Sequence, residues 1–291
     1  MNLQNSHLEN LLLQEYSRIF KQTPPPPWAV RKKSNPSEYI HPSIPFVGKH
    51  YTETSLLLYA SAENLAQYCK QSNPLPHLDN DSIAINRHRY CFENYSQGRF
   101  FPHLHLGPVN NGSLVVITAY LMMHLLGLEF NNPSELLEHI AVANFGKFSI
   151  ASQERNIDYA GSIDKLSFSF EYVKADLTIL RPRIIIIPKT IFNHKEVKEL
   201  IFSTCHNPPL IIPIYQINPT TINTRITRFP KKEKAELPAW LVQWHESLPQ
   251  HGNITGKIKE NFYSVYSYLD QFLDTTSNPS TEPNLTIPKK P

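Results

Sequence analysis

Short apolar runs alternate with amphipathic helical patterns from residue 56 onward. A run of β-branched residues such as Ile184–Ile187 is typical of a strand that is buried on both faces. We predict four strands on this basis: Leu56–Ala60, Ile140–Asn144, Ile184–Ile187 and Leu210–Ile214. Strands that alternate with helices favour an α/β fold, here a three-layer αβα sandwich with a mainly parallel central sheet.

Helical patterns fill the segments between these strands. Ser6 and Glu9 form a capping-box pattern that predicts the start of a first helix, which ends before Pro24. Further helices are expected where apolar residues follow a helical period or form a long run: 62–70, 114–128, a short helix from Pro133, 166–180, 192–204 and 258–272. The tract Pro24–Pro27 predicts a stiff polyproline strap that joins the first helix to the main body.

The organisation of the chain is that of a single domain. No internal repeat or break in composition divides residues 1–274. We expect an N-terminal helix and proline-rich strap (1–40), an α/β core (45–228) and a helical C-terminal part (229–274). Residues 275–291 are polar and rich in proline, which predicts a disordered tail.

Composition limits the classes of protein to consider. The 291 residues are 41% hydrophobic and carry 28 basic against 25 acidic side chains, a net charge of +3 that permits a basic groove without identifying a partner. The three cysteines form no CxxC pair, so neither a disulfide framework nor a cysteine-ligated metal site is expected. The chain starts without a signal-peptide pattern and lacks an apolar run of ~20 residues, which predicts a cytoplasmic protein without a membrane partner.

Common catalytic signatures are missing from the sequence. It contains no GxxxxGK[ST] phosphate loop, no GxSxG elbow, no GxGxxG after a strand and no HExxH zinc helix. His103 and His105 could ligate a metal, but no nearby Cys, Asp or Glu completes a site at a familiar spacing. We therefore expect neither a metal nor another cofactor.

Polar residues cluster directly after each of the four predicted strands. In open α/β sheets, ligands bind outside the carboxyl ends of parallel strands, because side chains and helix N-termini converge there. The clusters are residues 61–64, 144–147, 188–190 and 215–220. Each cluster alone is equally explained by turn-forming residues. Together they predict a ligand site at one edge of the sheet.

The order of these segments resembles the uracil-DNA glycosylase superfamily. The resemblance covers roughly residues 45–228 and rests on four segments: Tyr59-Ala-Ser-Ala-Glu-Asn64, the strand that ends in Asn144, Leu180-Arg-Pro-Arg-Ile-Ile-Ile-Ile187 and Ile217-Asn-Pro-Thr220. In that family the first strand delivers a water-activating Asp, Glu or Asn, and an aromatic segment stacks on the base. An asparagine after a later strand reads the pyrimidine edge, and a His-Pro-Ser loop grips the leaving base.

The resemblance implies catalytic roles for three residues. Glu63 matches the water-activating position, and Asn64 is the alternative; Glu63 would otherwise be an acid in the first turn of a helix. Asn218 stands where the family has its histidine. An amide can donate a hydrogen bond to a base carbonyl but supplies no cation, so the leaving base would be stabilised less.

A second set of residues is expected to bind substrate. Asn144 can offer a donor and an acceptor to a flipped pyrimidine, and the other candidates are Phe145, Lys147, Phe101, His103, Arg87, Arg89 and Gln216. Residues 86–92 interleave cations with rings, a combination that stacks bases and neutralises phosphates. Contacts with the DNA backbone are assigned to Lys189, Arg225 and Arg228. Turn formation, core packing and a solvated charged surface are the alternatives for these residues.

The activity that the resemblance implies is that of a DNA glycosylase. We expect a monofunctional, metal-independent monomer that hydrolyses the N-glycosidic bond of a modified or damaged pyrimidine in DNA. Because the pocket motifs depart from the family, a hypermodified cytosine of phage DNA, attacked in antiviral defence, is one such substrate. Two alternatives remain open: a non-catalytic nucleic-acid-binding module on the same fold, and a nucleoside-processing enzyme.

Overall fold

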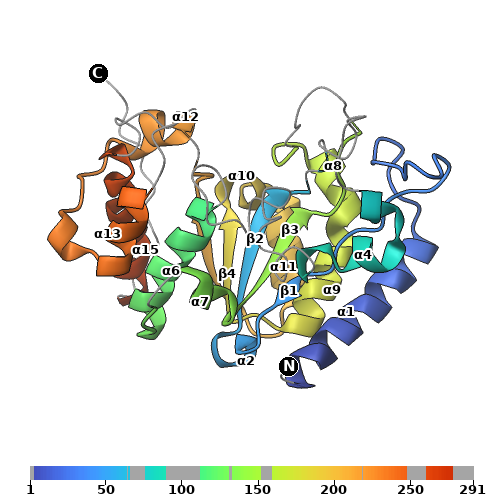
Figure 1. The fold of residues 1–291 in the computed structure, drawn as a ribbon, viewed down its shortest axis with the longest axis horizontal. Helices are drawn as coiled ribbons and strands as arrows, with labels where there is room; N and C mark the ends of the chain where they lie inside the picture. Colours follow the sequence, from blue (N-terminus) through green and yellow to red (C-terminus); the bar gives the residue numbers. More distant parts are fainter. Residues whose placement is uncertain are drawn as a thin grey trace.

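A five-stranded mixed sheet forms the centre of the protein (Figure 1). The computed structural model describes residues 3–63, 65, 76–89, 112–130, 133–151, 159–217, 219–247 and 260–277. The strands lie in the order β1-β3-β2-β4-β5, where β1 is antiparallel to β3 and all other neighbours are parallel. Their bounds are β1 Phe46–Val47, β2 Leu56–Ala62, β3 Ile140–Gly146, β4 Ile184–Pro188 and β5 Leu210–Ile214.

The predicted α/β fold with a mainly parallel sheet is confirmed. All four predicted strands form, and all four belong to the parallel part of the sheet. The antiparallel strand β1 was not predicted, because two residues are too short to show an alternating pattern.

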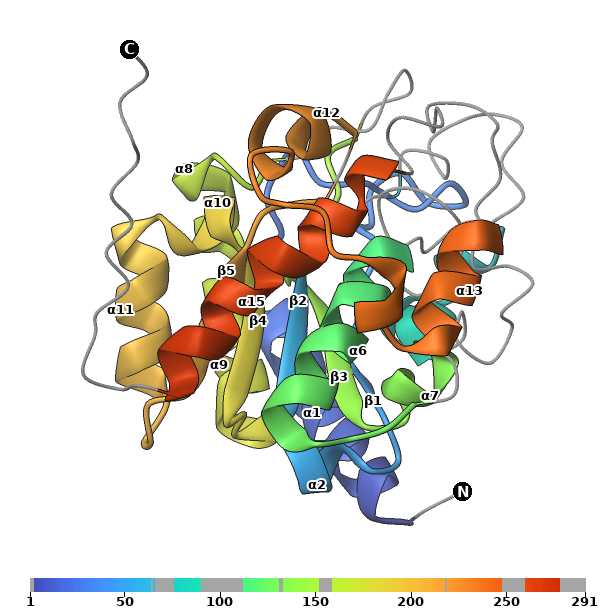
Figure 2. The same cartoon turned by 90° about the vertical axis from the view of Figure 1, so that its left-hand side faces the viewer.

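Helices cover both faces of the sheet, because side chains of a strand alternate between its faces. Leu56 and Leu58 of β2 point into one core, and Leu57 and Tyr59 point into the other. The first face carries α6 (Gly112–Leu126), α7 (Pro133–Leu137), α13 (Ala239–Ser247) and α15 (Tyr263–Ser277), as Figure 2 shows. The second face carries α1 (Leu3–Gln22), α8 (Ile163–Leu166), α9 (Phe170–Leu180) and α11 (Lys195–Thr204).

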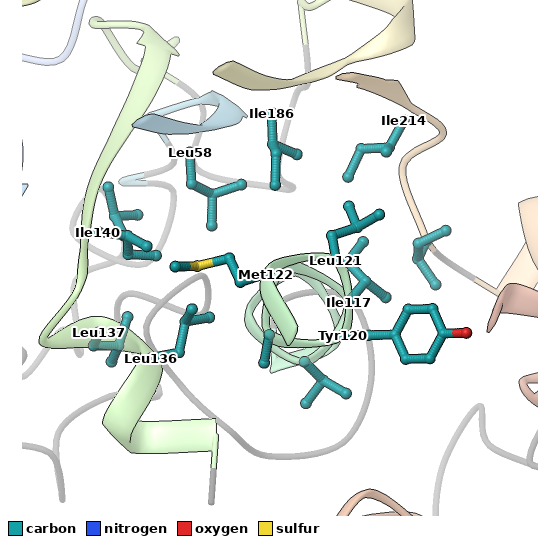
Figure 3. Packing of buried hydrophobic residues seen from close by; sticks show 14 of the residues in the cluster. Leu58, Ile117, Tyr120, Leu121, Met122, Leu136, Leu137, Ile140, Ile186 and Ile214 are labelled. Carbon is teal, nitrogen blue, oxygen red and sulfur yellow. The ribbon is translucent and has the colours of Figure 1, made fainter. Parts of the chain in front are cut away.

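Helix α6 is apolar around most of its circumference because it lies between the sheet and other helices. Leu121 and Met122 lie against Leu58 and Ile186 of the sheet (Figure 3). On the far side of the helix, the Tyr120 hydroxyl donates a hydrogen bond of 2.6 Å to Asp270 of α15. This packing accounts for the long apolar run in the sequence. Among the described residues, no helix has the length and apolarity needed to cross a bilayer.

The proline-rich strap crosses the end of β3. Ala29 forms an antiparallel bridge with Ile150, and the backbone N–H of Val30 donates to the carbonyl of Ser149 at 3.0 Å. The Trp28 ring packs edge-on against Tyr159, with ring centroids 5.3 Å apart. The strap therefore joins the N-terminal helix to the carboxyl edge of the sheet.

Shorter elements connect these layers. They are α2 (Tyr51–Thr54), η1 (Pro76–Asp79), α4 (Asp81–Ile85), η3 (Ser167–Ser169), α10 (Lys189–Phe192), α12 (Pro219–Thr221), η4 (Ile222–Ile226) and η5 (Lys234–Glu236).

Several predicted boundaries were wrong. Helix α1 begins at Leu3, so the capping-box pattern at Ser6 lies inside the helix; a single capping residue specifies a helix end only weakly. The helix predicted over 192–204 is two helices, α10 and α11, separated at Asn193 and His194. Ala62 belongs to β2, and residues 66–70 of the helix predicted there lie outside the described part of the chain. Helix α15 continues to Ser277, and the predicted tail beyond it, 278–291, is also outside the described residues.

Replacement of Leu58 by alanine is expected to test the core beneath α6. Leu58 is fully buried, so the variant loses apolar contacts and leaves a cavity, at a cost of about 2–5 kcal/mol in the free energy of unfolding measured with urea. Phe202→Ala serves as the control, because Phe202 is 49% exposed and its loss should cost ~0.5 kcal/mol or less. Equal effects of the two variants would contradict this packing.

Candidate functional site

Glu63 and Asn144 meet at the carboxyl edge of the sheet. Glu63 directly follows β2, and Asn144 lies opposite Ala60 in the parallel register of β2 with β3. The Asn144 side-chain amide donates to Glu63 Oε2 at 2.9 Å, and the Glu63 backbone N–H donates to the Gly146 carbonyl at 2.8 Å. Glu63 is 4% exposed and Asn144 is 3% exposed. Two residues predicted from separate strand ends are thus in direct contact.

The position of Asn144 differs from the prediction in one respect. Strand β3 continues beyond Asn144 to Gly146, because Gly146 pairs with Ala62 of β2. Asn144 is therefore a strand residue rather than a turn residue. The alternation of side chains then places Phe145 on the opposite face, where its fully buried ring packs edge-on against Tyr59 at a centroid distance of 5.3 Å. Phe145 is a core residue in this structure.

Arg87 neutralises the charge of Glu63. Its Nε donates to Glu63 Oε1 at 3.0 Å, and its Nη2 lies 2.8 Å from Glu63 Oε2. Its Nη1 donates to the carbonyls of His41 and Ala84, both at 2.7 Å. Because Arg87 is 1% exposed, this pair is desolvated and held in one geometry. Glu63 is accordingly a fixed negative charge with both oxygens engaged.

His88 is a residue of the site that the sequence did not single out. Its Nδ1 lies 2.9 Å from the Ile44 carbonyl, which can only accept, so Nδ1 carries a proton. Nε2 lies 3.4 Å from the Asn144 amide nitrogen and 3.9 Å from Glu63 Oε2. The one available signal was a histidine inside the cation-rich segment 86–92. An imidazole is present at the site even though position 218 lacks one.

A second buried ion pair lies on the other side of β3. Lys147 Nζ is 2.6 Å from Asp176 Oδ2, and the hydroxyls of Tyr16 and Tyr59 donate to the same carboxylate at 2.7 and 3.1 Å. Burial raises the pKa of Asp176 above its ordinary value, although Lys147 acts in the opposite direction. Burial likewise lowers the pKa of Lys147. The ammonium group of Lys147 is therefore bound within the protein.

Arg89 has a structural contact instead of facing Glu63. Its Nη2 lies 2.6 Å from a carboxylate oxygen of Glu9 in α1 and donates to the Val47 carbonyl at 3.1 Å. Arg89 thus ties the segment after α4 to α1 and β1.

The remaining cations gather at the other end of the same edge. The Tyr215 ring, directly after β5, has Lys189 Nζ 4.9 Å and Arg225 Cζ 5.5 Å from its centroid. Arg228 contacts the neighbouring ring of Phe229 at 5.0 Å. Tyr215 was not a predicted site residue, whereas its exposed neighbour Gln216 was.

Space beside Glu63 is small. The cavity that Glu63, Arg87, Lys147 and Ser149 help to line has a volume of about 10 Å³. A single water needs roughly this much room, so this cavity, which neither Asn144 nor His88 lines, is too small for a base.

Four predicted residues lie outside the described part of the chain: Asn64, Phe101, His103 and Asn218. Among the described residues, no group of three His, Cys, Asp or Glu side chains is placed to hold a metal ion. No protein-family model matches this sequence, and no curated protein is detectably similar to it. Conclusions about the site therefore rest on its geometry.

Loss of the Lys147–Asp176 ion pair should destabilise the protein by an amount that depends on pH. Lys147→Met leaves Asp176 buried without a counter-charge, which should cost about 3–5 kcal/mol of unfolding free energy near neutral pH. Burial raises the pKa of Asp176 in the folded protein above its value in the unfolded chain, which is about 4. Such a group destabilises the folded state progressively as the pH rises from the unfolded pKa to the folded pKa. The loss should therefore be smaller at pH 5 than at pH 7.5 in urea denaturation.

The double variant Lys147→Met/Asp176→Asn provides the control. Asparagine keeps an acceptor for the two tyrosines but carries no charge. This variant should recover much of the stability and lose the added pH dependence, whereas a pH-independent loss in both variants would contradict the ion-pair explanation.

Proposed function

We propose that this protein is a DNA glycosylase that hydrolyses the N-glycosidic bond of a modified or damaged pyrimidine in DNA. The observation that carries the proposal is the contact of Asn144 with Glu63, beside Nε2 of His88, at the carboxyl edge of a parallel sheet. A base-reading amide, an anion and a proton acceptor are the groups that this hydrolysis requires.

The geometry suggests a division of labour among the three residues. The C1′–N bond breaks with its electron pair going to the base, so positive charge develops on the sugar. The Glu63 carboxylate, although ion-paired with Arg87, offers its negative end to that charge. A water adds to C1′ and gives its proton to His88 Nε2, and His88 then passes this proton to the departing base through solvent, so that the imidazole returns to its starting state. Asn144 binds the edge of the base.

This division changes the role expected for Glu63. The carboxylate was expected to activate water, but both its oxygens are occupied by Arg87 and Asn144. His88 has the better-placed acceptor for a proton, since its Nδ1–H is already committed to Ile44.

The substrate class is part of the same proposal. Motif departures from the uracil-DNA glycosylase superfamily favour a pyrimidine other than uracil, and a hypermodified cytosine of phage DNA would give the enzyme a role in antiviral defence. Lys189, Arg225 and Arg228 at the far end of the edge would contact the DNA backbone.

A second candidate is a nucleic-acid-binding module without catalysis. The observation that favours it is that each of the three guanidinium nitrogens of Arg87 has a partner inside the protein. A buried, fully bonded network of this kind also serves to specify a fold.

Base release from modified DNA distinguishes the two candidates. Purified protein is incubated with duplex and single-stranded DNA that carries uracil, hydroxymethylcytosine or glucosylated hydroxymethylcytosine, and abasic sites are detected by alkaline cleavage. We expect release from at least one modified base, and a fall in the single-turnover rate of about 10²–10⁴-fold in His88→Asn. Asparagine at position 88 can keep the donor to Ile44 and removes only the Nε2 acceptor.

Two further variants complete this experiment. Asn144→Ala should raise the substrate concentration needed for half-maximal rate and lower the rate itself, and Glu171→Gln, an exposed change on α9, should have no effect. Glu63→Gln is examined together with Arg87→Met, because the single change leaves a buried cation unpaired. DNA binding without release of any tested base would favour the binding module and reject the enzyme.

A further inference from the structure

Three cations converge on Tyr215 without an acidic partner among the described residues. Lys189 and Arg225 lie over its ring, with Nζ 4.9 Å and Cζ 5.5 Å from the ring centroid, and the charge of Arg228 also acts on its hydroxyl. Arg225 and Arg228 are exposed, and Lys189 and Tyr215 are half-buried. Among the described residues no carboxylate lies at salt-bridge distance from any of the three cations, whereas the neighbouring Lys231, Lys232 and Lys234 each have a carboxylate partner.

The fold creates this juxtaposition. Pro188 of β4 pairs with Ile214 of β5, so the residues that follow them, Lys189 and Tyr215, emerge side by side. The π-helical turn η4, closed by the hydrogen bond from the Thr227 N–H to the Ile222 carbonyl, then returns Arg225 towards the same ring. Such turns are rare and occur often at functional sites.

Tyr215 is itself held in place by α15. Its backbone N–H donates to the Tyr268 hydroxyl at 3.0 Å, and the two rings stack with centroids 5.4 Å apart. The phenol is therefore a fixed element of the cluster, and the long cationic side chains have a rigid surface to pack on.

The electrostatic environment of Tyr215 agrees with this geometry. Partial burial alone would raise the pKa of its phenol, but the charges of Lys189, Arg225 and Arg228 outweigh burial, and the pKa lies below its ordinary value. The cluster thus stabilises negative charge at this position.

We propose that Lys189, Arg225 and Arg228, assembled around Tyr215, hold one phosphate group of the nucleic-acid strand. The identity of the strand rests on the function proposed above, whereas the phosphate site rests on the cluster alone. Guanidinium forks match phosphate oxygens, and Lys189 adds a third positive charge.

The position of the cluster suits a strand that extends along the edge of the sheet. β5 lies three strand spacings from β3, which carries Asn144, or roughly 14 Å at about 4.8 Å per spacing. A phosphate at Tyr215 and a base at Asn144 would therefore belong to neighbouring nucleotides of one strand. This separates base reading from phosphate binding along one edge of the sheet.

The salt dependence of binding tests whether one phosphate is held. Affinity for a single-stranded oligonucleotide is measured over a range of salt concentrations, a measurement that needs no base release. The triple variant Lys189→Gln/Arg225→Gln/Arg228→Gln should bind at least 10-fold more weakly at low salt, and the slope of log K against log [salt] should fall by about 1. A fall of about 2–3 would mean that the cations neutralise separate phosphates, and would overturn the single site.

A matched control removes equal charge elsewhere. Lys21→Gln/Lys174→Gln/Lys195→Gln changes three exposed lysines on α1, α9 and α11, and should leave affinity within about 2-fold. Equal losses in both triple variants would attribute binding to net charge and reject the site.

Titration of Tyr215 supplies a readout that is independent of nucleic acid. Phenolate absorbance of the wild-type protein, compared with Tyr215→Phe, should contain one tyrosine that ionises below the usual pKa. Inorganic phosphate should move this titration upward, because a bound anion offsets the cations, whereas sodium chloride at equal ionic strength should move it less. No difference between the two salts would count against the proposal.

Oligonucleotides with and without a 5′-phosphate show whether the site binds an internal phosphodiester or the phosphate at the end of a strand. Equal affinity for strands with and without a 5′-phosphate would assign the site to an internal phosphodiester, and a gain of 10-fold or more from the 5′-phosphate would assign it to a strand terminus. Either result supports a phosphate site. Retained phosphate binding without base excision would reject the glycosylase proposal and leave this one intact.

Discussion

The parallel pairing of β2 with β3 on one side and β4 on the other is the constraint on which the rest of the structure depends. Parallel strands end at a common edge, and Glu63, Lys189 and Tyr215 directly follow three of them there. The register of β2 with β3 decides that Asn144, rather than Phe145, faces Glu63. A shift of one residue would exchange these two side chains between the site and the core.

Burial of charge is the second constraint at this edge. Glu63 and Asp176 are carboxylates removed from water, and each is stable there only because a cation and several donors surround it. Arg87 and Lys147 therefore stabilise this edge through buried ion pairs, and each pair joins segments that are far apart in the sequence.

The two ends of the edge have opposite electrostatic character. At the β2–β3 end, charges are buried and mutually neutralised, which suits recognition by a few directed hydrogen bonds. At the β4–β5 end, cations remain exposed around a fixed ring, which suits an anion that arrives from solvent. A nucleotide has this same division between a base with directed donors and acceptors and a charged phosphate. The proposals for function and for phosphate binding therefore concern two parts of one ligand.

The sequence by itself determined the α/β fold, the four parallel strands and the clustering of polar residues after them. These features follow from local patterns, namely runs of apolar residues, helical periodicity and turn formers, which can be read without knowledge of the fold. Glu63 and Asn144 could be found in this way because each follows or ends an apolar run. The cations Lys189, Arg225 and Arg228 were predicted as DNA contacts from the same patterns, whereas Tyr215, around which the fold gathers them, was not among the predicted residues.

Only the tertiary structure decided which of these residues touch. Tyr16 and Asp176 are 160 positions apart in the sequence, and no local pattern indicates that they share a hydrogen bond. His88 gained its place from the packing of its segment against Ser43 and Ile44, and Arg89 was drawn to Glu9 instead of the site. The physical reason is that hydrogen bonds and ion pairs in a buried cluster depend on distances of about 3 Å, which long-range packing sets and sequence proximity does not.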